Sequence, residues 1–169
     1  MTLLIRSAGS GDLQALLALE RACFEQDGFN RRQLVYLLTR ANARTLVMLD
    51  PEARPCGYGT LLFRRNSRRV RLYSFCIHPG QRGSGNGRHL LKALEALARQ
   101  AGGEQLQLEV RADNRAAIAL YRRMGYRPLG WLDGYYEDGC GGWKMSRSLS
   151  EPEKAPAWQP VADDAAVSS

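Results

Sequence analysis

The chain has 169 residues, of which 44% are hydrophobic and 24% are charged, and its net charge is +7. This length suits one domain with a real core and is too short for two ordinary domains. No apolar run reaches the roughly 18 residues of a membrane span, and residues 1–12 lack a signal-peptide pattern. We therefore expect a cytoplasmic protein with no membrane partner.

The four cysteines, Cys23, Cys56, Cys76 and Cys140, lie far apart, and none form a Cys-x-x-Cys pair. This spacing argues against a zinc site or a disulfide framework and predicts no bound metal. The last twenty residues are acidic, so the positive charge concentrates in the rest of the chain. A positively charged domain attracts nucleic acid, acidic protein surfaces or a polyphosphate cofactor. The basic run at 64–69 has no interleaved aromatic residues, which makes nucleic acid an unlikely partner.

Hydrophobic periodicity predicts alternating strands and helices. In chain order we expect a strand at 3–5, helices at 13–24 and 30–38, and a strand at 45–49. Next we expect a hairpin formed by 57–63 and 69–77, and then a helix at 90–98. These are followed by a strand at 105–110, a helix at 114–124, and strands at 126–132 and 143–148. This order predicts an α/β fold with a mixed sheet and helices on both faces. Residues 150–169 are rich in Pro, Ala, Asp and Ser, and we expect them to be disordered.

A glycine-rich loop stands between a predicted strand and a predicted helix. Glycines let a phosphate approach backbone N–H groups at the start of a helix. A P-loop requires Lys-Ser/Thr after the last glycine, and the dinucleotide fingerprint requires Gly at position 88; the chain has Arg88-His89. The loop instead fits the pattern R/Q-x-x-G-x-G/A. Its residues are Arg82, Gly83, Ser84, Gly85, Asn86, Gly87 and Arg88. The structural alternative is a glycine turn that only caps a helix.

The segment 108–126 reads LEVRADNRAAIALYRRMGY. It resembles the LEVR-x-x-N-x-x-A-I-x-L-Y-x-x-x-G-F/Y segment of GNAT enzymes, and most closely that of the bacterial ribosomal-protein-alanine N-acetyltransferases. With the glycine loop and Tyr135-Tyr136, the resemblance spans about residues 3–148 and is weakest in the first third. It implies a GNAT fold with a six- to seven-stranded sheet in a domain 1–149, and acetyl-CoA as cosubstrate without a metal.

The resemblance also implies roles for individual residues. The loop 82–88 would hold the pyrophosphate of coenzyme A, and Asn114 would contact the pantetheine arm. Backbone N–H groups near Phe75 and Ile77 would polarise the thioester carbonyl. Tyr121 would protonate the leaving thiolate, and Glu109 would accept the amine proton.

The spacing of these residues agrees with such a site. Asn114 and Tyr121 are two helical turns apart and share a helix face, which we expect to converge with Glu109 beside the glycine loop. The alternatives are a helix cap for Asn114, a core aromatic for Tyr121 and a solvated carboxylate for Glu109. We expect His78 to end a strand and Cys76 to be a small buried residue rather than a covalent nucleophile.

The predicted reaction is direct transfer of acetyl from acetyl-CoA to a primary amine, with a protein or peptide N-terminus as the favoured acceptor. Tyr135 and Tyr136 match a tyrosine pair that lines the peptide groove of N-terminal acetyltransferases; the alternative is an exposed aromatic turn. The segment 24–30 departs from the Pro-Trp-Ser-like element of relatives that act on ribosomal protein. A small-molecule amine acceptor and a non-catalytic acyl-CoA-binding module therefore remain alternatives. The acceptor's identity and the oligomeric state are left open.

Overall fold

The computed structural model describes residues 2–24, 28–39 and 42–150. It contains seven strands, four α-helices and two short 3-10 helices in this range. The strands are β1 (Leu4–Ser7), β2 (Ala43–Leu49), β3 (Pro55–Phe63), β4 (Arg69–Ile77), β5 (Gln105–Arg111), β6 (Arg127–Leu132) and β7 (Gly142–Ser148). The helices are α1 (Leu13–Cys23), α2 (Arg31–Thr39), α3 (Asn86–Gln100) and α4 (Arg115–Arg123), with 3-10 turns at Ser10–Asp12 and Pro79–Gln81. The element order predicted from the sequence is confirmed; the tail expected at 150–169 lies, apart from Ser150, outside the described residues.

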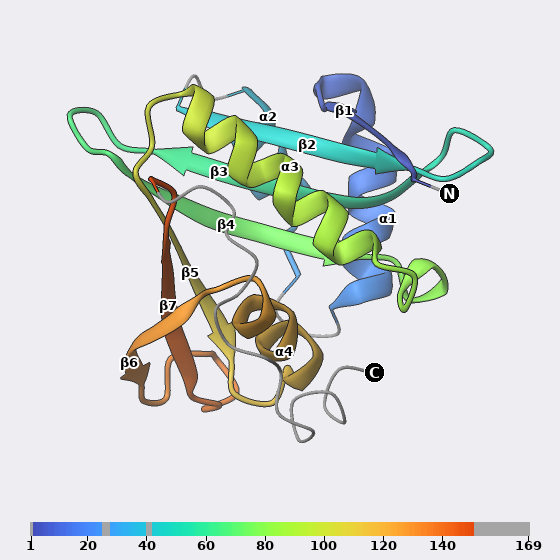
Figure 1. The fold of residues 1–169 in the computed structure, drawn as a ribbon. Helices are drawn as coiled ribbons and strands as arrows, with labels where there is room; N and C mark the ends of the chain where they lie inside the picture. Colours follow the sequence, from blue (N-terminus) through green and yellow to red (C-terminus); the bar gives the residue numbers. More distant parts are fainter. Residues whose placement is uncertain (1, 25–27, 40–41, 151–169) are drawn as a thin grey trace.

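The strands form one mixed sheet in the order β1-β2-β3-β4-β5-β7-β6. Every neighbouring pair is antiparallel except β4 and β5, which α3 connects as a parallel crossover. The parallel pairing runs only from Arg69↔Gln105 to Leu72↔Leu108, although β4 continues to Ile77 and β5 to Arg111. The two strands therefore separate halfway along their length (Figure 1).

A β-bulge marks the point where β4 leaves β5. Leu61 pairs with Leu72 and Thr60 pairs with Ser74, so Tyr73 is an additional residue in β4. A bulge bends its strand and changes which face the following side chains occupy. Accordingly Leu72 and Phe75 both belong to the core on the α3 side, although residues three positions apart in a regular strand lie on opposite faces. Cys76 belongs to the core under α1.

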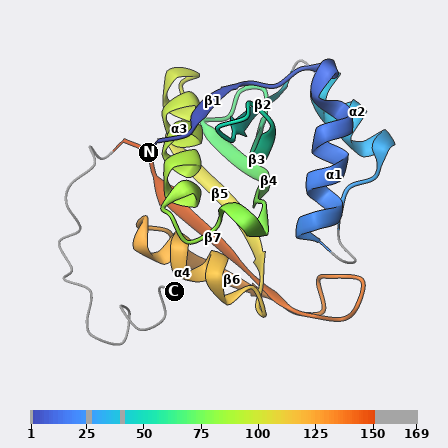
Figure 2. The ribbon, with the colours of Figure 1, turned by 90° about the vertical axis from the view of Figure 1, so that its right-hand side faces the viewer.

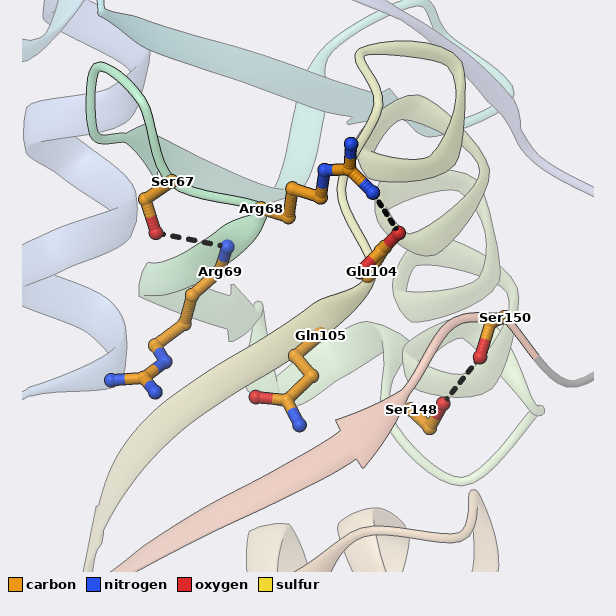
Figure 3. Close-up of a pocket in the computed structure, with 7 residues that line it drawn as sticks. All are labelled: Ser67, Arg68, Arg69, Glu104, Gln105, Ser148 and Ser150. Carbon is orange, nitrogen blue, oxygen red and sulfur yellow. Dashed lines mark hydrogen bonds and ion pairs between the residues drawn. The ribbon is translucent and has the colours of Figure 1, made fainter.

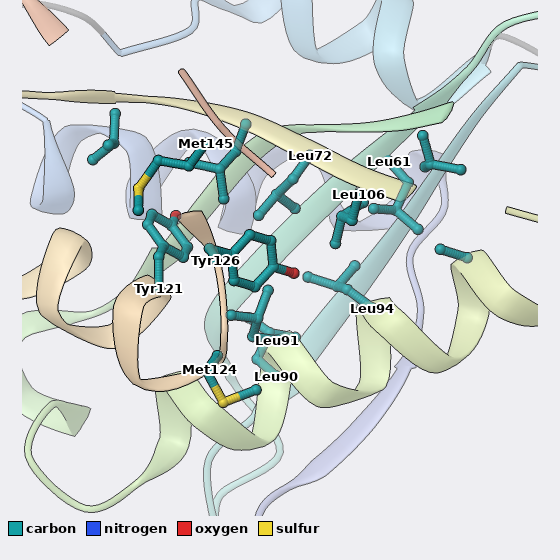
Figure 4. Close-up of a cluster of buried hydrophobic side chains, with 14 of the residues drawn as sticks. Leu61, Leu72, Leu90, Leu91, Leu94, Leu106, Tyr121, Met124, Tyr126 and Met145 are labelled. Carbon is teal, nitrogen blue, oxygen red and sulfur yellow. The ribbon is translucent and has the colours of Figure 1, made fainter. Parts of the chain in front are cut away.

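Helices cover both faces of the sheet, as predicted. The helices α1 and α2 pack on β2, β3 and β4, and α3 packs on β3 and β4 from the opposite face; α4 lies on the same side as α3 (Figure 2). The larger core lies between the sheet and α3 and α4, where Leu90, Leu91 and Leu94 of α3 meet Leu106 of β5 (Figure 4). Burial of such leucines contributes about 1.5–3 kcal/mol each. None of the described helices has the length and apolarity needed to cross a bilayer.

Candidate active site

The glycine loop lies at the end of β4 and leads into α3. The helix begins at Asn86, so Asn86, Gly87 and Arg88 form its first turn rather than part of the loop. Gly83 and Gly85 have φ angles of 84° and 77°, and a Cβ at either position would meet nothing within 4 Å. The loop therefore has a left-handed backbone with an open surface beside a helix N-terminus. This cradle fits a phosphate group of coenzyme A.

Side chains of the same loop hold it in shape. The Arg82 Nε donates to the Ile77 carbonyl at 2.8 Å, and the Asn86 Nδ2 donates to the Gln81 carbonyl at 2.8 Å. A Cβ on Gly87 would lie 3.2 Å from Leu120 of α4, so Gly87 allows the two helices to approach. The Arg82 Nε and the Asn86 amide thus hold the loop, and the backbone N–H groups in the first turn of α3 are donors that a phosphate could use.

The end of β4 offers backbone donors to the gap between β4 and β5. The His78 N–H donates to Cys56 of β3 at 2.7 Å. Since N–H groups alternate in direction along a strand, those of Ile77 and Phe75 point away from β3, beyond the last residue of β4 that pairs with β5. His78 itself ends the strand as expected, with its Nδ1 accepting from the Gly80 N–H at 3.0 Å.

Tyr121 of α4 lies on the α3 side of this gap. Its side chain is 5% exposed and its ring packs against Phe75 at 6.1 Å and Tyr126 at 5.7 Å, measured between ring centroids. Burial raises the pKa of the phenol well above its ordinary value. None of the described residues accepts a hydrogen bond from its hydroxyl. A protonated phenol is thus available at neutral pH for another molecule.

Asn114 caps α4, as the structural alternative predicted. Its Oδ1 accepts from the Ala117 N–H at 3.2 Å. Such a cap satisfies one of the unpaired donors of the first turn. The cap uses the side-chain oxygen and leaves the amide nitrogen as a donor.

Glu109 lies on the other face of β5. Its neighbours Leu108 and Val110 belong to the core around Tyr121, so the alternation of the strand places Glu109 opposite them. The Arg71 Nε contacts its Oε2 at 3.1 Å. We expected Asn114, Tyr121 and Glu109 to converge beside the glycine loop, and the structure places Tyr121 and Glu109 on different faces of β5. Tyr121 and Glu109 reach a common molecule only through the gap between β4 and β5.

Tyr135 and Tyr136 lie in the connection between β6 and β7, with their rings edge to face at 5.1 Å. The Arg111 guanidinium lies 5.0 Å from the Tyr136 ring centroid and pairs with Asp138 at 2.6 Å and Asp113 at 3.0 Å. Hydrogen bonds from Arg111 lower the pKa of both carboxyl groups. Arg111 thus holds the β6–β7 connection, which carries Tyr135 and Tyr136, against the end of β5. The sequence analysis missed this role, although Arg111 belongs to the LEVR motif.

A polar hollow of about 340 Å³ lies at the opposite end of β4 and β5 from the gap (Figure 3). It is lined by Ser67, Arg68, Arg69, Glu104, Gln105, Ser148 and Ser150. Arg68 and Glu104 pair there at 2.6 Å, with side chains 76% and 54% exposed. None of the residues predicted for the site lines this hollow, and such an exposed ion pair contributes little.

Comparison with known proteins identifies the family. The model of the acetyltransferase (GNAT) family matches residues 13–126, which hold both the glycine loop and the LEVR segment. The chain belongs to the GNAT family. The members of this family are acetyltransferases that use acetyl-CoA.

Individual relatives of this GNAT chain act on different acceptors. It is 38% identical over 82 residues to the N-alpha-acetyltransferase RimI of Mycobacterium tuberculosis, covering 48% of this chain and 50% of that protein. It is 32% identical over 97 residues to the streptothricin acetyltransferase of Streptomyces lavendulae, covering 57% and 51%. The chain thus matches about half the length of these curated relatives.

A solved structure confirms the fold. The ribosomal-protein-S18-alanine N-acetyltransferase of Escherichia coli superposes with a TM-score of 0.80 at 22% identity, covering 93% of this chain and all of that one. The predicted GNAT fold is confirmed, with seven strands.

The sequence also predicted that Cys76 is a buried residue rather than a nucleophile, and that the protein binds no metal. Cys76 is 5% exposed, and hydrogen bonding to Cys23 together with burial raises the pKa of its thiol. A buried thiol with a raised pKa is a poor nucleophile. Within the described ranges, no three His, Cys, Asp or Glu side chains gather in a group that could hold a metal ion.

Proposed function

We propose that this chain transfers the acetyl group of acetyl-CoA to the α-amine of a peptide or protein N-terminus. The observation that carries the proposal is the gap between β4 and β5, which has Tyr121 on one face of the sheet and Glu109 on the other. A donor that lies along the α3 and α4 side and an acceptor that arrives from the Glu109 side meet at the sheet without competing for space. Residues 1–149 form the catalytic domain in this proposal, acting in the cytoplasm.

The donor would be held by groups on the α3 side. The N–H groups of Gly83–Arg88 face its phosphates, and the Asn114 amide nitrogen donates to its pantetheine arm. Acetyl-CoA supplies a thioester whose acetyl carbon is attacked and whose thiol leaves. The Phe75 and Ile77 N–H groups stabilise the negative charge that develops on the carbonyl oxygen.

Two side chains would move protons. The incoming ammonium must lose a proton before it attacks, and Glu109 accepts it directly or through a water molecule. Tyr121 donates its proton to the departing sulfur, since its hydroxyl is protonated at neutral pH and has no acceptor among the described residues. Tyr135 and Tyr136, fastened by Arg111, form one wall for an extended chain end.

The test compares kcat/KM, read by thiol release, for peptides with free N-termini, peptides with blocked N-termini that contain lysine, and spermidine. Free N-termini should be preferred by at least tenfold. Tyr136→Ala should raise KM for the peptide and leave KM for acetyl-CoA unchanged, while Tyr36→Ala, a half-exposed tyrosine of α2, should change neither. Equal rates with blocked peptides, or a preference for spermidine, would reject the proposal.

A small-molecule amine is the second candidate acceptor. The likeness to a streptothricin acetyltransferase, which matches more of the chain than the RimI relative does, favours it. A kcat/KM for a small amine that is higher than the kcat/KM for every peptide would support this second candidate.

A further inference from the structure

Arg71 is held rigidly beside the candidate base. Its Nε lies 3.1 Å from the Glu109 Oε2, and its guanidinium carbon lies 4.9 Å from the centroid of the Tyr73 ring. Phe29 stacks on Tyr73 at 5.2 Å with an interplanar angle of 22°. An ion pair on one side and an aromatic ring on another fix the plane of the guanidinium.

The residue that holds Phe29 in this stack, Glu20, is itself buried. The Phe29 N–H donates to the Glu20 Oε2 at 2.8 Å, and Glu20 is 2% exposed. The other oxygen of Glu20 accepts from the buried Tyr58 hydroxyl. Phe29, which stacks on the Tyr73 ring, is therefore anchored to α1 and β3 through Glu20. This support limits the motion of the ring that Arg71 contacts, which reduces the entropy lost when Arg71 binds a ligand.

Most donors of Arg71 are left for another molecule. Only its Nε is used, and within the described part of the chain no residue accepts from its two Nη groups. The side chain is 41% exposed, against 19% for Glu109. Paired N–H groups of an arginine match the two oxygens of a carboxylate.

The surrounding charge favours an anion. Glu109 pairs with Arg71 of β4, and its cross-strand partner in β7 is Lys144, so two cationic residues share its face of the sheet. The ammonium of an acceptor binds at Glu109. A second positive charge on the acceptor is repelled here, whereas a negative one is attracted.

We propose that Arg71 is a specificity-determining residue that binds a carboxylate of the acceptor, a few bonds from the reacting amine. The proposal rests on the proposed function and narrows its substrate class. Because Arg71 and Glu109 touch, the groups that they bind must also be close together. An N-terminal Asp or Glu has this arrangement, since its side-chain carboxylate is three or four bonds from the α-nitrogen. A free acidic amino acid has the same chemistry.

The experiment measures kcat/KM for peptides that begin with Asp, Glu, Asn, Gln or Ala and are otherwise identical, and for free aspartate and asparagine. The wild type should prefer Asp over Asn and Glu over Gln by about 10-fold or more, as expected for a charge-assisted hydrogen bond. Arg71→Gln should reduce this ratio to nearly one. Arg69→Gln removes a charge from the same face of the same strand and should keep the ratio.

The ratio separates binding from a structural role. If Arg71 only positioned Glu109, Arg71→Gln would slow the Asp and Asn peptides equally and leave their ratio unchanged, which would overturn the proposal. A wild type that acetylates Asn and Asp peptides equally would overturn it too, and would leave the proposed function intact. Preference for free aspartate over free asparagine and over all peptides would support the role of Arg71 and reject the peptide acceptor.

Discussion

At the scale of single residues, our proposal gives Tyr121 and Glu109 opposite proton transfers. Tyr121 is buried among aromatic rings, which keeps its proton in place, whereas Glu109 is partly exposed and paired with a cation. In our proposal the general acid and the general base therefore lie on opposite faces of the sheet. The sheet thus separates the two functions in space.

Replacing Tyr121 with Phe removes only the hydroxyl. We expect kcat to fall by about 10²–10⁴-fold, the usual contribution of a general acid, with little change in acetyl-CoA affinity. The melting temperature should also stay near that of the wild type, because the hydroxyl has no partner among the described residues. Steady-state kinetics with a saturating acceptor and a thermal melt measure both effects. An unchanged kcat would remove Tyr121 from the mechanism.

Glu20 is a buried carboxyl group, and its titration should make the free energy of unfolding depend on pH. Burial raises its pKa, although hydrogen bonds from Tyr58 and Phe29 oppose this shift. A pKa that is higher in the folded state stabilises the protein below the unfolded pKa of about 4.3, and this stabilisation is lost as the pH rises through the folded pKa.

Glu20→Gln removes this titration. The melting temperature of the variant minus that of the wild type should therefore increase from pH 4 toward pH 7, as measured by thermal melts at constant ionic strength. Tyr58→Phe keeps the carboxyl but removes a hydrogen bond that opposes the shift, so its own pH dependence should be steeper than that of the wild type. A Glu20→Gln difference that is constant with pH would contradict the raised pKa.

At the scale of elements, the two ends of α3 provide a matched pair of glycines. Gly85 before the helix and Gly102 after it have φ angles of 77° and 88°, and neither has an atom within 4 Å of the place of a Cβ. Alanine at either position suffers the same left-handed backbone strain, of about 1 kcal/mol. Only Gly85 belongs to the loop that we assign to coenzyme A.

Gly85→Ala and Gly102→Ala should therefore lower the melting temperature by similar amounts. Only Gly85→Ala should weaken acetyl-CoA binding, by about tenfold or more, because its methyl group projects from the cradle. Calorimetric titration with acetyl-CoA gives the affinities. Equal affinities in the two variants would show that the loop does not bind the cosubstrate.

At the scale of the whole molecule, Leu149 is the last buried residue of the part of the chain that the structure describes. This residue is 3% exposed, its N–H donates to the Glu104 carbonyl at 2.8 Å, and its carbonyl accepts from the Arg99 Nε at 3.0 Å. It therefore ties the end of β7 to the end of α3 and the start of β5.

A chain shortened to residues 1–150 should keep its melting temperature and its kinetic constants. A chain shortened to residues 1–147 loses Leu149 and its two hydrogen bonds, and should melt roughly 5–10 °C lower. Thermal melts of both chains, followed by acetyl-CoA turnover of the first, make the comparison. A lower melting temperature for 1–150 would show that residues beyond 150 stabilise the domain.

The sequence by itself determined the order of strands and helices, the mixed sheet and the place of the glycine loop. Each of these follows from local patterns: periodicity of 2 or 3.6, glycines between a strand and a helix, and the motif at 108–126. The cap by Asn114 was also predictable as an alternative, because capping joins residues three positions apart.

Only the tertiary structure decided how the site residues face one another. The packing of α4 on one face of the sheet puts Tyr121 in the core with Leu108 and Val110, while the bulge at Tyr73 decides which face Phe75 and Cys76 of β4 occupy. The pairing of Arg71 with Glu109 joins residues 38 positions apart. Such contacts depend on sheet register, and one additional residue in a strand turns the following side chains to the other face. Periodicity predicts that a strand has two faces, but the packed sheet decides which face each side chain occupies.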